Sequence, residues 1–112
     1  MDVNIKQSGS ISIVSVTGRM DAITADSATT VLNEQVQSGN KSIVLDLSGV
    51  DYMSSAGLRV VLTILKAARK DGGDLYIADA QKGVADVLEI SGFSNLLKIF
   101  DTVDEAVAEF NS

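Results

Sequence analysis

Apolar and polar positions alternate near the start of the chain in a way that predicts two strands. Residues 3–6 show a weak alternation, and the run from Ile11 to Val16 is a stronger strand signal that stops at Gly18. Turn-forming residues at positions 8–10 separate the two runs. We therefore expect an antiparallel hairpin at the N-terminus.

The next periodic stretch has the spacing of an amphipathic helix, from Thr24 to Gln37. Thr24 is the predicted N-cap, and Asp26 suits the positive end of the helix dipole. Polar and glycine residues at positions 38–40 end the helix. Its apolar face consists of Ala25, Ala28, Leu32 and Val36.

Residues 43–70 combine a strand, a polar turn and a long helix. The run Ile43–Leu47 is almost continuously apolar, which is typical of a strand covered on both faces in a parallel sheet. The helix that follows the two serines extends to Lys70, and Arg59, Thr63, Lys66 and Lys70 form its solvent side. Leu58, Val61, Leu62 and Leu65 should pack on the sheet, and a second apolar file, Val60, Ile64 and Ala67, forms either a wider buried face or a partly exposed docking strip.

The C-terminal third continues the alternation of strands and helices. It predicts a strand over residues 75–78, a helix that ends at Gly92, a strand over residues 96–100 and a last helix that opens on a capping box, Thr102 to Glu105. Short connections between alternating elements build right-handed βαβ units. The predicted fold is therefore a single α/β domain over residues 1–112, with a mostly parallel sheet, an N-terminal antiparallel hairpin strand and four helices.

Composition excludes several classes of function. The chain has no Cys and no His, so thiol chemistry, a Ser-His-Asp triad and His-ligated zinc are excluded, and it has no phosphate-binding glycine loop. The net charge of −6 and the scarcity of aromatics argue against nucleic acid. No apolar run approaches the length of a membrane span, and no secretory signal opens the chain. We expect a cytoplasmic protein that is not an enzyme and has no cofactor.

Open α/β sheets bind ligands and partners at the carboxyl ends of their strands. A serine at a helix start usually serves as the N-cap, and one serine suffices for that role. Here there are two, so Ser54 is the predicted cap and the hydroxyl of Ser55 is free to point outward. Gly57 lowers helix propensity in the first turn, which is tolerable where something approaches the backbone closely. The other candidates at this edge are Asp21, Asp46, Asp51 and Asp79.

Several carboxylates at strand ends also raise the possibility of a magnesium site, as in a phospho-accepting receiver domain. That design needs an adjacent acidic pair after the first parallel strand. The chain has no such pair, since Asp46 stands alone within its strand. We therefore expect no metal site.

Three motifs in order resemble the anti-sigma factor antagonists, the bacterial branch of the STAS domain family (sulfate transporter and anti-sigma factor antagonist). Residues 18–22, Gly-Arg-Met-Asp-Ala, resemble the family's Gly-x-Leu/Met-Asp turn, and residues 44–50 resemble its central strand. Residues 51–58, Asp-Tyr-Met-Ser-Ser-Ala-Gly-Leu, resemble its phosphorylation motif. The resemblance covers nearly the whole chain.

The resemblance implies binding to an anti-sigma factor serine kinase with a histidine-kinase-like ATPase fold. The unphosphorylated antagonist occupies that kinase and frees a sigma factor; the kinase phosphorylates the antagonist, and a PP2C-type serine phosphatase reverses the modification. The acceptor serine maps onto Ser55, and Asp21 maps onto an acidic residue beside it. The implied partner-binding residues are Asp21, Ser54, Ser55, Ala56, Gly57 and Arg59.

One position departs from the family pattern. Many members with established switches carry Asp where this chain carries Ser54. The alternative is therefore a constitutive STAS scaffold, or a transport-associated interaction module, that works without phosphorylation.

Overall fold

The computed structural model describes every residue from 1 to 112. Five strands and four α-helices follow one another, with one turn of 3₁₀-helix at Phe93–Asn95. The strands are β1 (Asp2–Ser8), β2 (Ile11–Met20), β3 (Ser42–Met53), β4 (Asp74–Ala78) and β5 (Ile99–Phe100). The helices are α1 (Ala25–Gln37), α2 (Ser55–Lys70), α3 (Lys82–Ile90) and α4 (Val103–Phe110).

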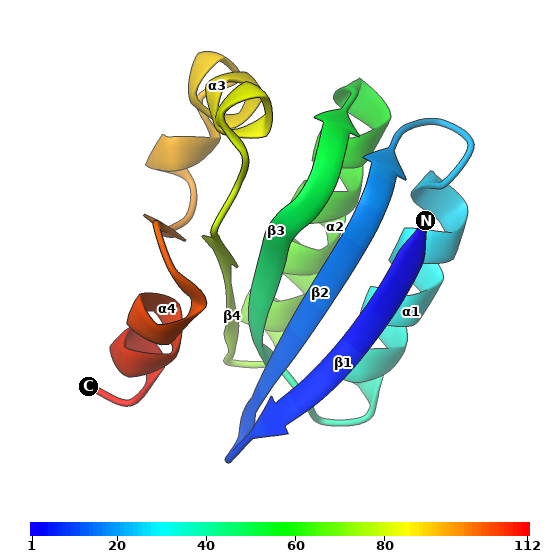
Figure 1. Ribbon diagram of the computed structural model, residues 1–112. Coiled ribbons are helices and arrows are strands. Elements are labelled where there is room, and N and C mark those ends of the chain that lie inside the picture. Colours follow the sequence, from blue (N-terminus) through cyan, green and yellow to red (C-terminus); the bar gives the residue numbers. More distant parts are fainter.

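The strands form one sheet in the order β1-β2-β3-β4-β5 (Figure 1). β1 and β2 pair antiparallel, and every other neighbouring pair is parallel. This confirms the predicted fold class, including the N-terminal hairpin and the number of helices. Because β2, β3 and β4 run in the same direction, their carboxyl ends reach the same edge of the sheet.

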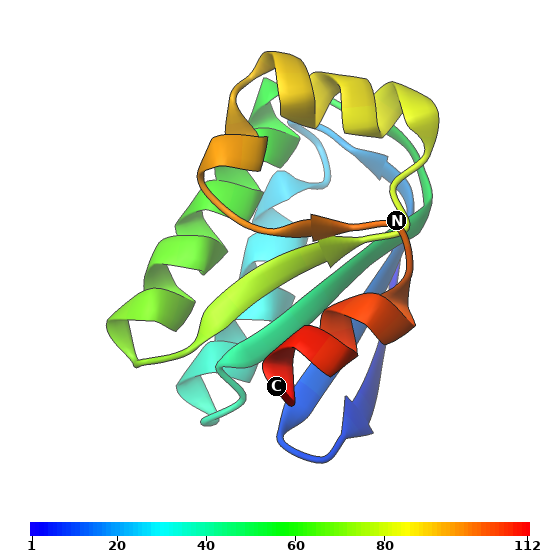
Figure 2. The same cartoon turned by 90° about the vertical axis from the view of Figure 1, so that its left-hand side faces the viewer.

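Helices cover both faces of the sheet. α1 and α2 lie on one face and α4 lies on the other, while α3 crosses above the carboxyl ends of the strands (Figure 2). The larger core lies beneath α1, α2 and α3, and the smaller one joins α4 to the sheet through residues such as Val44 and Tyr76. The paired segments Ile43–Leu45 of β3 and Leu75–Ala78 of β4 are apolar and buried throughout, as expected for parallel strands between two layers.

The two central strands are longer than the sequence pattern predicts. β2 passes through Gly18, which adopts a positive φ of 100°, and continues to Met20. β3 continues from Leu47 to Met53 in place of the predicted polar turn, so only Ser54 separates it from α2. Two register shifts between β2 and β3 absorb the irregularity and keep the strands paired to their ends. Both strands therefore continue beyond the apolar runs that predicted them.

The last strand, in contrast, is shorter than the sequence pattern predicts. Residues 96–100 were expected to be extended, but only Ile99–Phe100 pair with β4. A guanidinium nitrogen of Arg69 donates to the carbonyl of Leu96 at 2.8 Å, and Leu97 N–H donates back to Phe93. These bonds hold the chain in a turn until Lys98, whose carbonyl accepts from Ile77 N–H. The strand is short because its first half is used in other contacts.

The second apolar file of α2 belongs to the buried face. Val60 and Ile64 are buried in the larger core, and Ala67 is half-buried against it. The predicted solvent side is confirmed, since Arg59, Thr63, Lys66 and Lys70 are all exposed. No helix is both long enough and apolar enough to span a bilayer.

Candidate functional site

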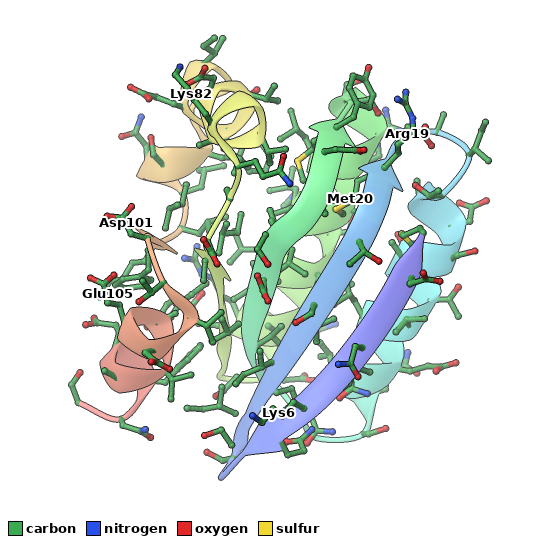
Figure 3. All side chains as sticks on the ribbon, in the orientation of Figure 1. Lys6, Arg19, Met20, Lys82, Asp101 and Glu105 are labelled. Atoms are coloured by element: carbon green, nitrogen blue, oxygen red, sulfur yellow. The ribbon has the colours of Figure 1, made fainter.

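The ends of β2 and β3 meet where α2 begins. Arg19 and Met20 pair in register with Tyr52 and Met53. The next residue, Ser54, donates its backbone N–H to the Met20 carbonyl at 2.9 Å. Figure 3 shows the side chains of Arg19 and Met20 at this end of the sheet. This junction holds the β2–α1 loop beside the first turn of α2.

The two serines at the junction have different roles. Ser54 is the N-cap of α2, and its hydroxyl oxygen accepts the Ala56 N–H at 3.2 Å, which confirms the predicted cap. Ser55 is the first helical residue and is exposed, with no hydrogen bond from its hydroxyl to another residue. A modification of Ser55 therefore leaves the side-chain cap intact.

Gly57 makes room for the chain's own β2. The residue is buried, and a Cβ there would lie 2.6 Å from the Met20 carbonyl oxygen and 2.9 Å from Cγ of Met53. Such distances are shorter than any ordinary van der Waals contact. The close approach that the sequence suggested at Gly57 is thus made by Met20 within the molecule, and it seats α2 on the end of β2.

Asp21 organises the β2–α1 loop. Its Oδ1 accepts the N–H groups of Ile23 at 3.0 Å and Thr24 at 3.2 Å, as in a turn closed by an aspartate side chain. Thr24 occupies the N-cap position of α1, but its side chain makes no cap bond to the helix. The hydroxyl of Thr24 donates instead to the Arg19 carbonyl at 2.8 Å and accepts from Asp21 N–H. The predicted N-cap position at Thr24 is confirmed, but the side-chain cap bond is absent because the hydroxyl oxygen is used to close the loop.

Arg19 links the loop to β3. Its Nε lies 3.2 Å from Oδ2 of Asp21, and its guanidinium lies 4.3 Å from the centre of the Tyr52 ring. The hydrogen bond from Arg19, helped by the N–H groups of Thr24 and Ile23, lowers the pKa of Asp21 below its usual range, although partial desolvation opposes the shift. Asp21 is therefore an anion at neutral pH.

The other acidic candidates differ in where they lie relative to the junction. Asp46 is in the middle of β3, about 23 Å along the strand from Met53, and accepts the Ser15 hydroxyl at 2.9 Å. Asp51 is exposed on the last part of β3. Asp79 follows β4 with a positive φ of 57°, an uncommon backbone conformation for a residue other than glycine.

The remaining predicted partner-binding residues gather on the first turn of α2. Ser55 and Arg59 are exposed. Ala56 is half-buried, as is Ser54, whose hydroxyl oxygen makes the cap bond. Gly57 lies below this surface. The structure thus brings Asp21 and the start of α2 to one edge of the sheet, on either side of the Met20 carbonyl.

Sequence reasoning missed three side chains at this edge. The side chain of Arg19 is 59% exposed, Tyr52 is 44% exposed and Ile23 is 90% exposed, a large amount for an isoleucine. The pairing of Arg19 with Tyr52 depends on the register of β2 on β3, which local patterns do not give. Ile23 belongs to a connection, where an apolar residue carries no periodic signal.

Comparison with known proteins gives a consistent result. The family model of the STAS domain matches residues 2–106. A protein of Bordetella bronchiseptica named "putative anti-sigma factor antagonist BtrV" is 36% identical over 100 residues, which are 89% of this chain and 86% of that protein.

Solved structures show the same fold. The structure of a Thermotoga maritima protein named "putative anti-sigma factor antagonist" superposes with a TM-score of 0.93, at 26% identity over 98% of this chain and 95% of that chain. The Bacillus cell fate determinant SpoIIAA, solved in its phosphorylated form, shares the fold with a TM-score of 0.76, at 14% identity over 97% of this chain and 99% of that chain. The chain belongs to the STAS domain family, and its similarity is to the members named as anti-sigma factor antagonists.

Proposed function

We propose that the chain is an anti-sigma factor antagonist whose binding to an anti-sigma factor serine kinase is switched by phosphorylation of Ser55. The observation that carries the proposal is that the two serines have different structural roles. Ser54 caps α2, and Ser55 presents a free, exposed hydroxyl one residue later. The kinase transfers the γ-phosphoryl group of ATP to this oxygen, the hydroxyl proton is lost and ADP leaves. A PP2C-type phosphatase returns the hydroxyl by hydrolysis, with release of inorganic phosphate.

The partner-binding surface comprises the β2–α1 loop and the first turn of α2. Asp21 and Arg59 supply charges of opposite sign, and Ile23 and Tyr52 supply apolar contact area. The surface residues that we assign are Asp21, Ser54, Ser55, Ala56 and Arg59, with Gly57 seating the helix beneath them.

Phosphorylation opposes binding by charge. A phosphate adds about −1.5 to −2 charges at neutral pH, to a chain whose net charge is already −6. Asp21, ionised because its pKa is lowered, and Asp51 lie at the same edge of the sheet. Because Ser55 is exposed and does not serve as the cap, the modification is compatible with the folded chain. The expected result is loss of the partner without unfolding.

The test uses the purified cognate kinase, ATP and four forms of the chain. Peptide mapping should locate the phosphate on Ser55, and Ser55→Ala should abolish labelling while Ser54→Ala retains it. Ser55→Asp should lose kinase binding and keep the circular dichroism spectrum of the native chain. Labelling at Ser54 alone would contradict the assignment of the acceptor. Tight binding by Ser55→Asp would support the constitutive scaffold instead.

A further inference from the structure

Arg59 lies one turn along α2 from Ser55. Residues four apart on a helix are neighbours on its surface, and an advance of four residues is about 6 Å along the axis. Helical side chains lean toward the N-terminus, so Arg59 extends over the turn that Ser55 begins. Both residues are exposed and belong to the solvent side of the helix. The guanidinium is therefore within reach of a group attached to the Ser55 oxygen.

The guanidinium of Arg59 has no competing partner. It makes none of the four ion pairs in the molecule, and α2 carries no Asp or Glu. Arg19, the other arginine at this edge, is already bonded to Asp21 and stacked on Tyr52. Arg59 is thus the cation that remains free to respond to a new negative charge at the start of α2.

We infer that Arg59 is the intramolecular partner of a phosphate on Ser55, and that this pairing withdraws Arg59 from the partner-binding surface. The inference rests on the proposed modification of Ser55. A phosphate offers oxygens that match the planar fork of a guanidinium, and an acidic group four residues before a basic one is the favourable order on a helix. One modification then changes two features of the surface, since it adds an anion and occupies a cation.

The proposed pairing acts only over a short distance, and a second cation on the same helix provides a control for this. Lys66 lies on the same solvent side of α2, but it is eleven residues from Ser55, about 16 Å along the helix axis. This separation exceeds the screening length of about 8 Å at physiological ionic strength. Lys66→Gln therefore removes the same charge as Arg59→Gln without removing the proposed contact.

The experiment installs phosphoserine at position 55 by genetic incorporation, so it needs no kinase. ³¹P NMR titration of the full chain reports the second pKa of the phosphoserine, which is about 6 without partners. We expect Arg59→Gln to raise this pKa by roughly 0.3 unit, the size of one ion pair on an exposed helix, and Lys66→Gln to leave it unchanged. Arg59→Lys should give an intermediate value, because it keeps the charge and loses the fork. The side-chain Nε–H resonance of Arg59 should also shift on phosphorylation.

Two results would overturn the inference. One is a phosphoserine pKa that is the same with Arg59 and with Gln at that position. The other is an equal shift for Arg59→Gln and Lys66→Gln, which would indicate a general field and no contact. Neither result bears on the proposed function, which stands or fails on labelling of Ser55 by the kinase. If the kinase ignores Ser55 while the pKa shift is present, the pairing holds and the proposed switch fails.

Discussion

Substitution of Gly57 by Ala tests how α2 is seated on the sheet. The added Cβ would lie 2.6 Å from the Met20 carbonyl oxygen, 2.9 Å from Cγ of Met53 and 3.0 Å from Cβ of Met20. The carbonyl belongs to paired backbone at the end of β2, so it does not move aside as a flexible side chain would. The start of α2 must shift outward, and the shift strains the bond from Ser54 N–H to the same carbonyl.

The expected cost follows from two opposing effects. Overpacking of a well-packed position typically destabilises by about 1–3 kcal/mol. Replacement of Gly by Ala within a helix returns up to about 1 kcal/mol, because Ala has the higher helix propensity. We therefore expect Gly57→Ala to lower the free energy of unfolding by about 1–2 kcal/mol, and the melting temperature by about 4–9 °C for a domain of this size.

Gly83 provides a matched control. It also lies in the first turn of a helix, α3, but a Cβ there would meet no atom within 4 Å. Gly83→Ala should therefore stabilise the chain by a few tenths to about 1 kcal/mol. Urea unfolding of both variants measures the difference, and amide exchange at Ser54 reports the strained hydrogen bond. A Gly57→Ala variant as stable as the wild type, with Ser54 equally protected, would refute the close contact with Met20.

Two further predictions concern the same edge of the sheet. Ser54→Ala should lower the free energy of unfolding by about 1 kcal/mol because it removes the helix cap, whereas Ser55→Ala should change it by less than about 0.5 kcal/mol; equal effects in urea unfolding would contradict their different roles. Arg19→Gln should raise the pKa of Asp21 toward its ordinary value of 3.8, as followed by NMR of the carboxyl carbon. Since the folded-state pKa lies below 3.8, the ionised carboxylate stabilises the native chain above that pH, and the contribution disappears as the pH falls through the folded-state value; a variant with an unchanged pKa would remove Arg19 as the cause.

The fold was predictable because each element carries its own periodic signal. The apolar run at Ile43–Leu47 identified a strand covered on both faces, and the spacing of Leu58, Val61 and Leu65 identified the helix that follows it. Strand ends were less predictable. β2 and β3 extend beyond their apolar runs because each pairs with the other through two register shifts, and pairing between distant segments leaves no mark in local patterns.

The candidate site was likewise predictable only where a feature depends on local sequence. The cap at Ser54 could be read from the residue type and its place before an apolar helix. The roles of Asp21 and Thr24 could not, because both residues are good cap formers and the backbone path decides which oxygen faces which N–H. The contact between Arg19 and Tyr52 required the register of two strands. Local chemistry was thus visible in the sequence, while contacts between elements were not.

The Met20 carbonyl explains why the two halves of the surface form one unit. Ser54 N–H donates to this oxygen, and Gly57 leaves the space that lets α2 approach it. The residue after Met20 is Asp21, whose side chain fixes the loop on the other side. Loop and helix are therefore held by adjacent backbone atoms, with little freedom to move independently. A phosphate on an exposed Ser55 breaks none of these contacts, so the switch that we propose changes the charge of the surface and leaves its geometry in place.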